Sequence, residues 1–149
     1  MISFSTKRFE QLSTTELYEI LKLRAEVFVV EQHCVYMDMD DKDYQCLHVL
    51  GYHGEDLAAY TRLVPQGISY EEASIGRVVT SPLYRKHGYG KLLMEYSIHQ
   101  TLSSFQCQVI VISAQHYLER FYTALGFKAE GDIYLEDEIP HIKMRYLKG

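Results

Sequence analysis

The sequence predicts a mixed α/β fold, in which helices pack against a sheet. Three observations predict it. Segments with helical and strand periodicity alternate along the 149 residues, one pair of strand-like segments is joined by a short turn, and no linker, repeat or low-complexity tract divides the chain. The hairpin and the order of elements exclude a doubly wound parallel sheet. A single domain over residues 1–149 is expected, since domains usually run about 100–200 residues.

The first third of the chain predicts a strand, a long helix and a loop. Residues 2–9 are short and partly alternating, which favours an edge strand. Ser13 and Glu16 have the spacing of a capping box, so a helix should begin at about residue 14. Apolar residues then recur at helical spacing to about residue 32, and the acidic stretch 38–43 should form a solvated loop.

Eight further elements follow from the same patterns. Residues 47–52 and 57–63 flank a short polar turn and predict a β-hairpin. The others are a strand at 73–80, a helix at 89–102, a strand at 107–112, a helix at 117–125 closed by Gly126, and strands at 128–134 and 141–147.

Composition and charge exclude several classes of protein. With 15 basic and 20 acidic residues the net charge is −5, which argues against a nucleic-acid-binding protein. No apolar run approaches the ~18 residues of a membrane span, and no signal peptide is visible. Cys34, Cys46 and Cys107 are expected to be reduced thiols in the cytoplasm. Their spacing from His33 and His48 does not match a zinc site, so no metal is expected.

The most informative segment is a glycine loop that follows the strand at 73–80. It reads Arg85-Lys86-His87-Gly88-Tyr89-Gly90-Lys91, and a helix begins within it. Glycines let backbone N–H groups approach an anion, and the helix N-terminus and the cations favour negative charge. A third glycine of a dinucleotide fingerprint and the Gly-Lys-Ser/Thr of a Walker loop are both absent. A tight turn with no ligand is the alternative.

At these residues the sequence resembles a known family. The strand at 73–80, the Arg-x-x-Gly-x-Gly loop and the helix that follows it together resemble motif A of the GCN5-related N-acetyltransferases (GNAT). Residues 121–127 resemble the family's Tyr-x-x-x-Gly-Phe segment. Residues 23–32, Tyr36-x-Asp38-x-Asp40, Arg62-Leu63 and residues 139–142 are similar to the small ElaA-like branch. The resemblance covers about residues 15 to 147. It implies a mixed, mostly antiparallel central sheet flanked by helices.

The resemblance also implies a reaction, in which acetyl-CoA transfers its acetyl group to a primary amine by direct attack in a ternary complex. Tyr122 would protonate the departing thiolate as the general acid. Gln115 stands where relatives often carry an asparagine that contacts the cofactor. The other implied cofactor contacts are the backbone of Val78, Val79 and Thr80 at the thioester arm, and Arg85, Lys86, His87, Gly88, Tyr89, Gly90 and Lys91 at the pyrophosphate.

The general base stays open at this stage. Glu31 and His48 are candidates, although Glu31 could simply pair with a neighbour and His48 could be a core histidine. Asp43, Glu72, His141 or a chain of water molecules are further candidates. Arg24, on a mostly apolar helix face, could contact substrate or anchor a buried carboxylate.

The acceptor that the resemblance implies is a small-molecule or protein amine, and the acidic stretch 38–43 could attract it if it is cationic. Two other functions are compatible with the sequence: a CoA-binding regulatory module with little or no catalysis, and an interaction domain that binds no nucleotide. An exposed sheet edge could support a homodimer.

Overall fold

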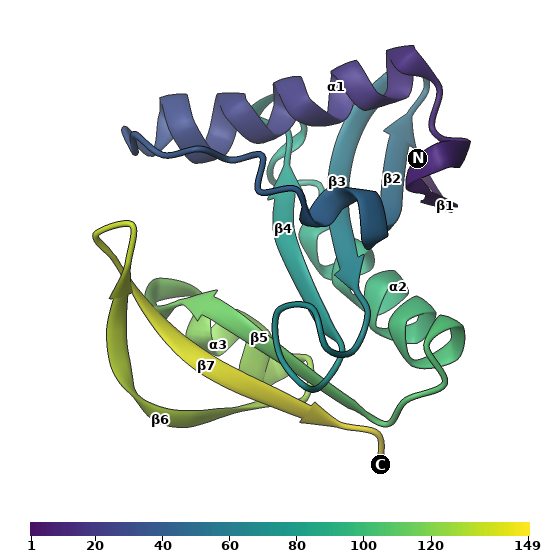
Figure 1. Ribbon diagram of the computed structural model, residues 1–149. Helices are drawn as coiled ribbons and strands as arrows, with labels where there is room; N and C mark the ends of the chain where they lie inside the picture. Colours follow the sequence, from purple (N-terminus) through teal and green to yellow (C-terminus); the bar gives the residue numbers. More distant parts are fainter.

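Two antiparallel sheets form the centre of the molecule, and they touch at one point (Figure 1). The computed structural model describes residues 1–149. The elements are β1 Ile2–Arg8, α1 Thr14–Arg24, β2 Leu47–His53, β3 Asp56–Val64, β4 Ser74–Thr80, α2 Tyr89–Ser104, β5 Val109–Gln115, α3 Glu119–Ala124, β6 Phe127–Glu136 and β7 Ile139–Leu147. Their order matches the order predicted from the sequence.

The strand order is β1-β2-β3-β4 in one sheet and β5-β7-β6 in the other, and every neighbouring pair is antiparallel. A single parallel bridge joins Ala73 to Ile110, where the Val111 N–H donates to the Ala73 carbonyl at 2.9 Å. Beyond it β4 and β5 diverge (Figure 1). The mixed, mostly antiparallel fold flanked by helices is therefore confirmed, but its division into two sheets was not predicted.

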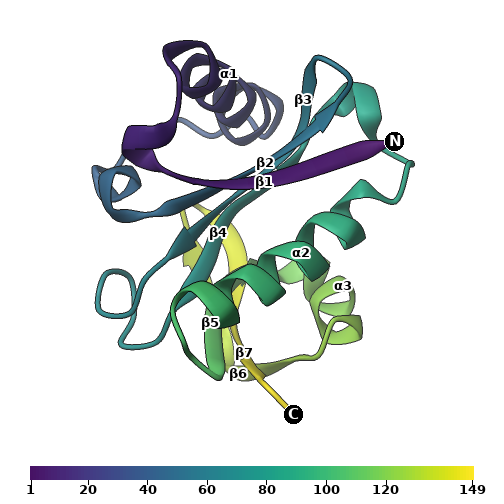
Figure 2. The ribbon, with the colours of Figure 1, turned by 90° about the vertical axis from the view of Figure 1, so that its right-hand side faces the viewer.

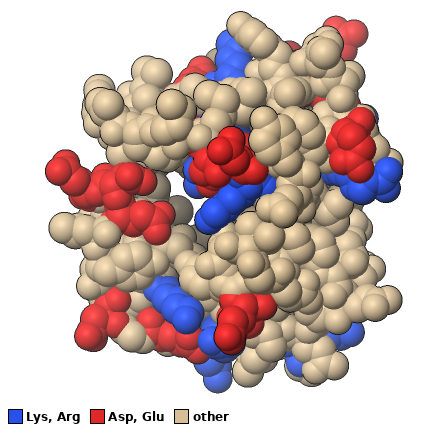
Figure 3. All heavy atoms as spheres, viewed as in Figure 1, with Lys and Arg blue, Asp and Glu red and all other residues tan.

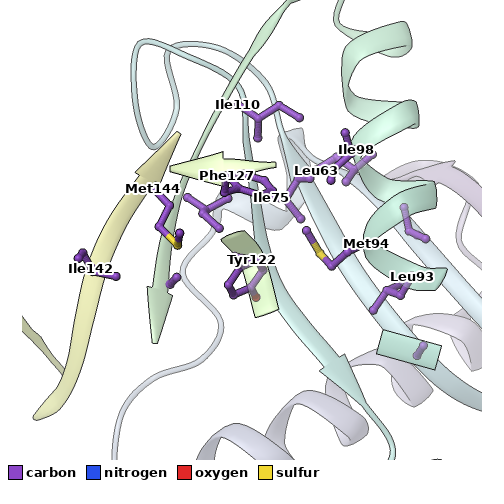
Figure 4. Packing of buried hydrophobic residues seen from close by; sticks show 14 residues of the cluster. Leu63, Ile75, Leu93, Met94, Ile98, Ile110, Tyr122, Phe127, Ile142 and Met144 are labelled. Carbon is purple, nitrogen blue, oxygen red and sulfur yellow. The ribbon is translucent and has the colours of Figure 1, made fainter. Parts of the chain in front are cut away.

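The helices cover both faces of the first sheet and thereby form two cores (Figure 2). On one face, α1 packs Ile20 and Leu23 against Leu50 and Tyr60. On the other face, α2 packs Leu93, Met94 and Ile98 against buried residues of both sheets. Figure 4 shows this larger core, in which Tyr122 of α3 lies near Phe127 and Ile75. The larger core holds the two sheets together where they meet. None of the helices is long and apolar enough to span a membrane.

The first helix begins as predicted but changes its winding. Ser13 Oγ accepts the Glu16 N–H at 3.0 Å, and Glu16 Oε1 accepts the Ser13 N–H at 2.9 Å, which is the expected capping box. The α-helix ends at Arg24, and a π-helical segment continues from Ala25–Glu31. Its wider turns accommodate an extra residue, which apolar periodicity does not reveal. Two later elements also have boundaries that differ from the prediction. β5 begins and ends later than the strand predicted at 107–112, and α3 is shorter than the helix predicted at 117–125.

The acidic stretch 38–43 is not a solvated loop, and that prediction was wrong. Asp38 is 7% exposed and Asp43 is 8% exposed. Both are held by Arg24, which is fully buried: its Nε lies 2.8 Å from Asp38 Oδ2 and its Nη1 lies 2.8 Å from Asp43 Oδ1. Arg24 is thus an anchor for buried carboxylates, which was one of its two expected roles.

Two arginines from the sheet complete this ion-pair network. Arg62 of β3 donates to both oxygens of Asp40, at 2.8 and 2.6 Å. Arg77 of β4 donates from Nε to Asp38 Oδ1 and from Nη2 to the Asp38 carbonyl, each at 2.7 Å. Buried charges need partners because desolvation is costly. The ion pairs with the three arginines therefore allow the aspartates of this stretch to be buried.

The ion pairs keep the carboxylates of Asp40 and Asp43 ionised. Burial by itself would raise the pKa of Asp43, but the hydrogen bonds and charges of Arg24 and Arg62 outweigh it and lower that pKa below its usual value. Asp40 behaves in the same way: its hydrogen bonds with Arg62 outweigh burial and lower its pKa. Asp38, Asp40 and Asp43 are therefore paired with arginines, and Asp41 is the exposed aspartate of the stretch.

Without Arg24, the buried carboxylates of Asp38 and Asp43 would each lose an ion-pair partner. We expect Arg24→Met to lower the free energy of unfolding by about 3–5 kcal/mol, the usual cost of breaking a buried ion pair, measured by urea denaturation. Arg8→Met is the matched control, since the Arg8–Glu10 pair is exposed and solvent screens it, so its loss should change stability little. Equal losses in the two variants would contradict a stabilising role for the buried network.

Candidate active site

A cavity of about 870 Å³ lies where β4 and β5 diverge. Its walls are β4, β5 and α3, and its roof is the π-helical segment with the following loop; the β6–β7 hairpin closes the remaining side. Because the strands separate beyond Ala73, the edge of β4 that faces β5 has no strand partner. Its backbone N–H and C=O groups are available to an extended ligand, as at any sheet edge.

A β-bulge shapes the wall formed by β4. Arg77 and Val78 together stand opposite one residue of β3, Thr61. Arg77 has a φ of 51°, a left-handed conformation that a non-glycine residue adopts only with strain. The two 2.7 Å hydrogen bonds to Asp38 hold its side chain in place. The predicted thioester contacts line the cavity: Val78 belongs to the bulge, and Val79 and Thr80 follow it.

The glycine loop lies at one end of this cavity and leads into α2. Gly88 precedes the helix with a φ of 74°, and Lys86 has a φ of 71°. No side chain caps the N-terminus of α2, so the first N–H groups of a 16-residue helix are free to bind an anion. Arg85 and Gly90 line the cavity, whereas Lys86, His87, Tyr89 and Lys91 do not.

Arg85 is held by Glu31 across the cavity. Its two terminal nitrogens lie 2.7 and 2.6 Å from the two Glu31 oxygens, a bidentate pair between the π-helical segment and the glycine loop. The Arg85 hydrogen bonds lower the pKa of Glu31 below its ordinary value. A carboxylate that is stabilised in this way is a poor proton acceptor, so the geometry favours the pairing role of Glu31 over the base role.

Tyr122 reaches the cavity from α3. It lines the cavity although it is only 5% exposed, and its ring packs edge-on against Phe127, with centroids 5.8 Å apart. Burial raises the pKa of Tyr122 well above its usual value. The hydroxyl therefore stays protonated over the physiological range and is available as a donor, as a general acid requires.

The wall opposite the glycine loop carries polar side chains of the second sheet. Gln115 at the end of β5 lines the cavity and donates to Gln32 at 3.3 Å. His141 of β7 stands opposite Gln115 in the sheet register and also lines the cavity. In Figure 3, acidic side chains cover the β6–β7 hairpin beside the hollow. They belong to Glu136, Asp137 and Glu138, the last residue of β6 and the turn.

Three of the candidate bases lie outside the cavity. His48 is 1% exposed, and its ring nitrogens contact the Tyr60 hydroxyl at 2.6 Å and the Asp43 carbonyl at 2.9 Å; burial lowers its pKa. Asp43 belongs to the ion-pair network. Glu72 pairs with Arg145 at 3.0 Å. Of the side-chain candidates, only Glu31 and His141 line the cavity.

Sequence reasoning missed the roles of Arg77 and Glu136. An arginine within a β-branched strand is itself a signal, because a cation there requires a buried carboxylate partner. Glu136 offered no such signal, since it is one of several acidic residues near a turn. The three cysteines are free thiols, and no cluster of three or more His, Cys, Asp or Glu residues could hold a metal ion.

Comparisons with known proteins agree with this geometry. A family model described as an acetyltransferase (GNAT) domain matches residues 10–148. A UPF0039 protein of Schizosaccharomyces pombe is 41% identical over 146 residues, covering 97% of this chain and 96% of its own. The crystal structure of an acyl-CoA N-acyltransferase from Pseudomonas aeruginosa superimposes with a TM-score of 0.91 at 37% identity, covering 98% and 99% of the two chains. Escherichia coli ElaA also gives a TM-score of 0.91, at 34% identity and the same coverage.

Proposed function

This chain belongs to the GNAT acetyltransferase family, in its ElaA-like branch, and on that premise we propose that it is an acetyl-CoA-dependent N-acetyltransferase acting on a primary amine. The amine attacks the thioester directly while both substrates are bound. The observation that carries the proposal is the position of Tyr122, a buried phenol that opens onto the cavity between β4 and β5.

The donor half of the cavity has the groups that acetyl-CoA requires. The diphosphate would bind at the free N–H groups of α2 and at Arg85. The pantetheine arm carries amides, and it would lie along the unpaired edge of β4 as an added strand does. A backbone N–H near the bulge at Arg77 would then polarise the thioester carbonyl.

The reaction exchanges a C–S bond for a C–N bond. The amine must first lose a proton, because a lysine-like ammonium has a reference pKa of about 10.4 and has no free electron pair. The neutral nitrogen attacks the carbonyl carbon, and the negative charge that develops on oxygen is stabilised by backbone donors. As the C–S bond breaks, the sulfur takes the proton of the Tyr122 hydroxyl, and the tyrosinate is reprotonated from solvent. The attacking nitrogen becomes cationic when the C–N bond forms, and it loses its second proton to solvent as the amide is produced.

The first test is an acceptor screen. Release of CoA thiol from acetyl-CoA should be followed by a thiol reagent, across small amines, polyamines, amino acids and lysine peptides. We expect at least one primary amine to increase the release, and mass spectrometry to find that amine acetylated. CoA binding without transfer to any amine would favour the alternative, a CoA-binding regulatory module. Absence of CoA binding would favour an interaction domain.

Tyr122→Phe removes only the phenolic oxygen and should separate catalysis from binding. Loss of a general acid typically costs about 10²–10⁴-fold in rate, so we expect kcat to fall by about 100-fold or more while the Kd for acetyl-CoA is retained. Tyr117→Phe is the matched control, because Tyr117 is an exposed tyrosine at the rim of the same cavity. An unchanged kcat would remove Tyr122 from the mechanism.

The Glu31–Arg85 pair should compete with the donor for the same guanidinium. Arg85→Gln should weaken CoA binding, measured by calorimetry, and reduce its salt dependence, because one phosphate contact is lost. Glu31→Gln frees Arg85 and should strengthen CoA binding a few-fold. Glu71→Gln, an exposed change of the same charge away from the cavity, should have no effect. Equal affinity in all three variants would place the diphosphate elsewhere.

A further inference from the structure

His141 presents an unpartnered nitrogen to the cavity. Its Nδ1 lies 2.7 Å from the Ile139 carbonyl. Because a carbonyl oxygen only accepts, Nδ1 carries the hydrogen of the neutral ring, and Nε2 is left with a lone pair. The residue is 6% exposed and lines the cavity, yet no protein donor reaches Nε2. Nε2 therefore opens to the cavity as an acceptor without a protein donor, and a bound ligand can supply one.

Glu136 places a second acceptor beside it. One carboxylate oxygen, Oε1, accepts a hydrogen bond from Ser113 Oγ at 3.0 Å, and Ser113 is also hydrogen-bonded to the Tyr134 hydroxyl. The other oxygen, Oε2, lies 3.7 Å from His141 Nε2, which is too far for a hydrogen bond. Two acceptors therefore face each other across a gap, with no proton between them.

The neighbours of His141 leave this gap without a competing cation. On β6 the facing titratable groups are Glu136 and Tyr134, whose ring stacks on the imidazole with centroids 6.1 Å apart. On β5 the opposite residue is the neutral Gln115. On β7 itself, Lys143 points to the Tyr70 ring at 5.7 Å and lies 3.9 Å from Glu130.

Asp137 also lines the cavity and its carboxylate has no partner, whereas most other polar groups across the cavity already have one. These contacts are Asp40 with Arg62 and Arg77, Lys42 with Ser69, Glu31 with Arg85, Tyr36 with Asp38, and the Cys34 thiol with the Asp137 carbonyl. Glu136 is thus the cavity carboxylate that keeps an oxygen free next to an imidazole.

We infer that His141 and Glu136 form the binding site for the acceptor as a protonated primary amine, with His141 as its general base. The inference rests on the proposed function and specifies its substrate class. An ammonium group has several N–H donors, so one can reach Glu136 Oε2 while a second reaches His141 Nε2. A neutral alcohol of the same size has one donor and no charge, and it cannot satisfy both acceptors.

The same contacts would carry out the deprotonation. The ammonium N–H bond breaks, its electron pair stays on nitrogen, and the proton moves to His141 Nε2. The imidazolium that results lies beside the Glu136 carboxylate, which stabilises its charge. The neutral amine attacks the thioester from the β7 side, while Tyr122 donates its proton to sulfur. The nitrogen that has bonded to the acyl carbon is cationic and loses its second proton to solvent as the amide forms. The imidazolium later releases its proton to solvent, so the ring is regenerated.

Binding can be tested without turnover. Protein labelled with ¹⁵N-histidine is titrated with n-butylamine, which is butylammonium at neutral pH, and with 1-butanol as the neutral analogue. The His141 signals are identified by their loss in His141→Gln. We expect butylammonium to shift the Nε2 signal and 1-butanol to leave it unchanged. Glu136→Gln should reduce the shift, whereas Glu138→Gln, which removes the same charge from the adjacent turn, should retain it. Equal responses to both probes, or none, would overturn the site.

Kinetics test the base role. With the fastest acceptor from the screen, kcat/KM is measured against pH. His141→Gln should lower kcat by about 10²-fold or more and abolish the acid limb of the profile, while its thermal unfolding and CoA binding are retained. His99→Gln, on the exposed face of α2, is the control. Glu136→Gln should mainly raise KM, by about tenfold or more. An acid limb that persists in His141→Gln would overturn the base role, whereas failure of every amine in the screen would overturn the proposed function and leave the ¹⁵N result to judge the site.

Discussion

The buried guanidinium of Arg24 is the interaction on which the site depends. It fixes Asp38 and Asp43, and Asp38 in turn holds the side chain of Arg77. Arg77 is the left-handed residue of the β4 bulge, so this chain of contacts connects the first helix with the strand wall that would receive the thioester. Strain at one backbone position is sustained because ionic contacts on its side chain oppose relaxation.

Because β4 and β5 diverge, a cavity opens beside the wall that the ion pairs hold in place. A continuous sheet would pair the backbone groups that a pantetheine arm needs, and it would bury Tyr122 completely. Because a single bridge at Ala73 joins the sheets, Tyr122 of α3 and the polar face of β7 open into the same cavity. In the proposed mechanism, proton donation to sulfur and proton removal from the amine would therefore come from different secondary structure elements.

Sequence patterns predicted the order of strands and helices, the capping box at Ser13 and the glycine loop, since each depends on residues that are close in the chain. They did not predict the burial of the acidic stretch, because its partners Arg62 and Arg77 come from distant strands. The division of the sheet also depends on long-range pairing. Glu31 and His48 were plausible bases in the sequence, and only their neighbours in space, Arg85 and Tyr60, distinguish them from His141.

The ion-pair network also makes one side of the cavity, the loop that carries Asp38, harder to displace than the β6–β7 hairpin on the other side. Lifting the loop that carries Asp38 would separate buried charges, at a cost of several kcal/mol. The tip of the β6–β7 hairpin opposes motion far less, because residues 131–138 are exposed and the Cys34 thiol is the contact that ties the turn to the roof. If the proposed function holds, entry of the acceptor and release of the product should be governed by hairpin opening, and their rates by the local stability of that hairpin.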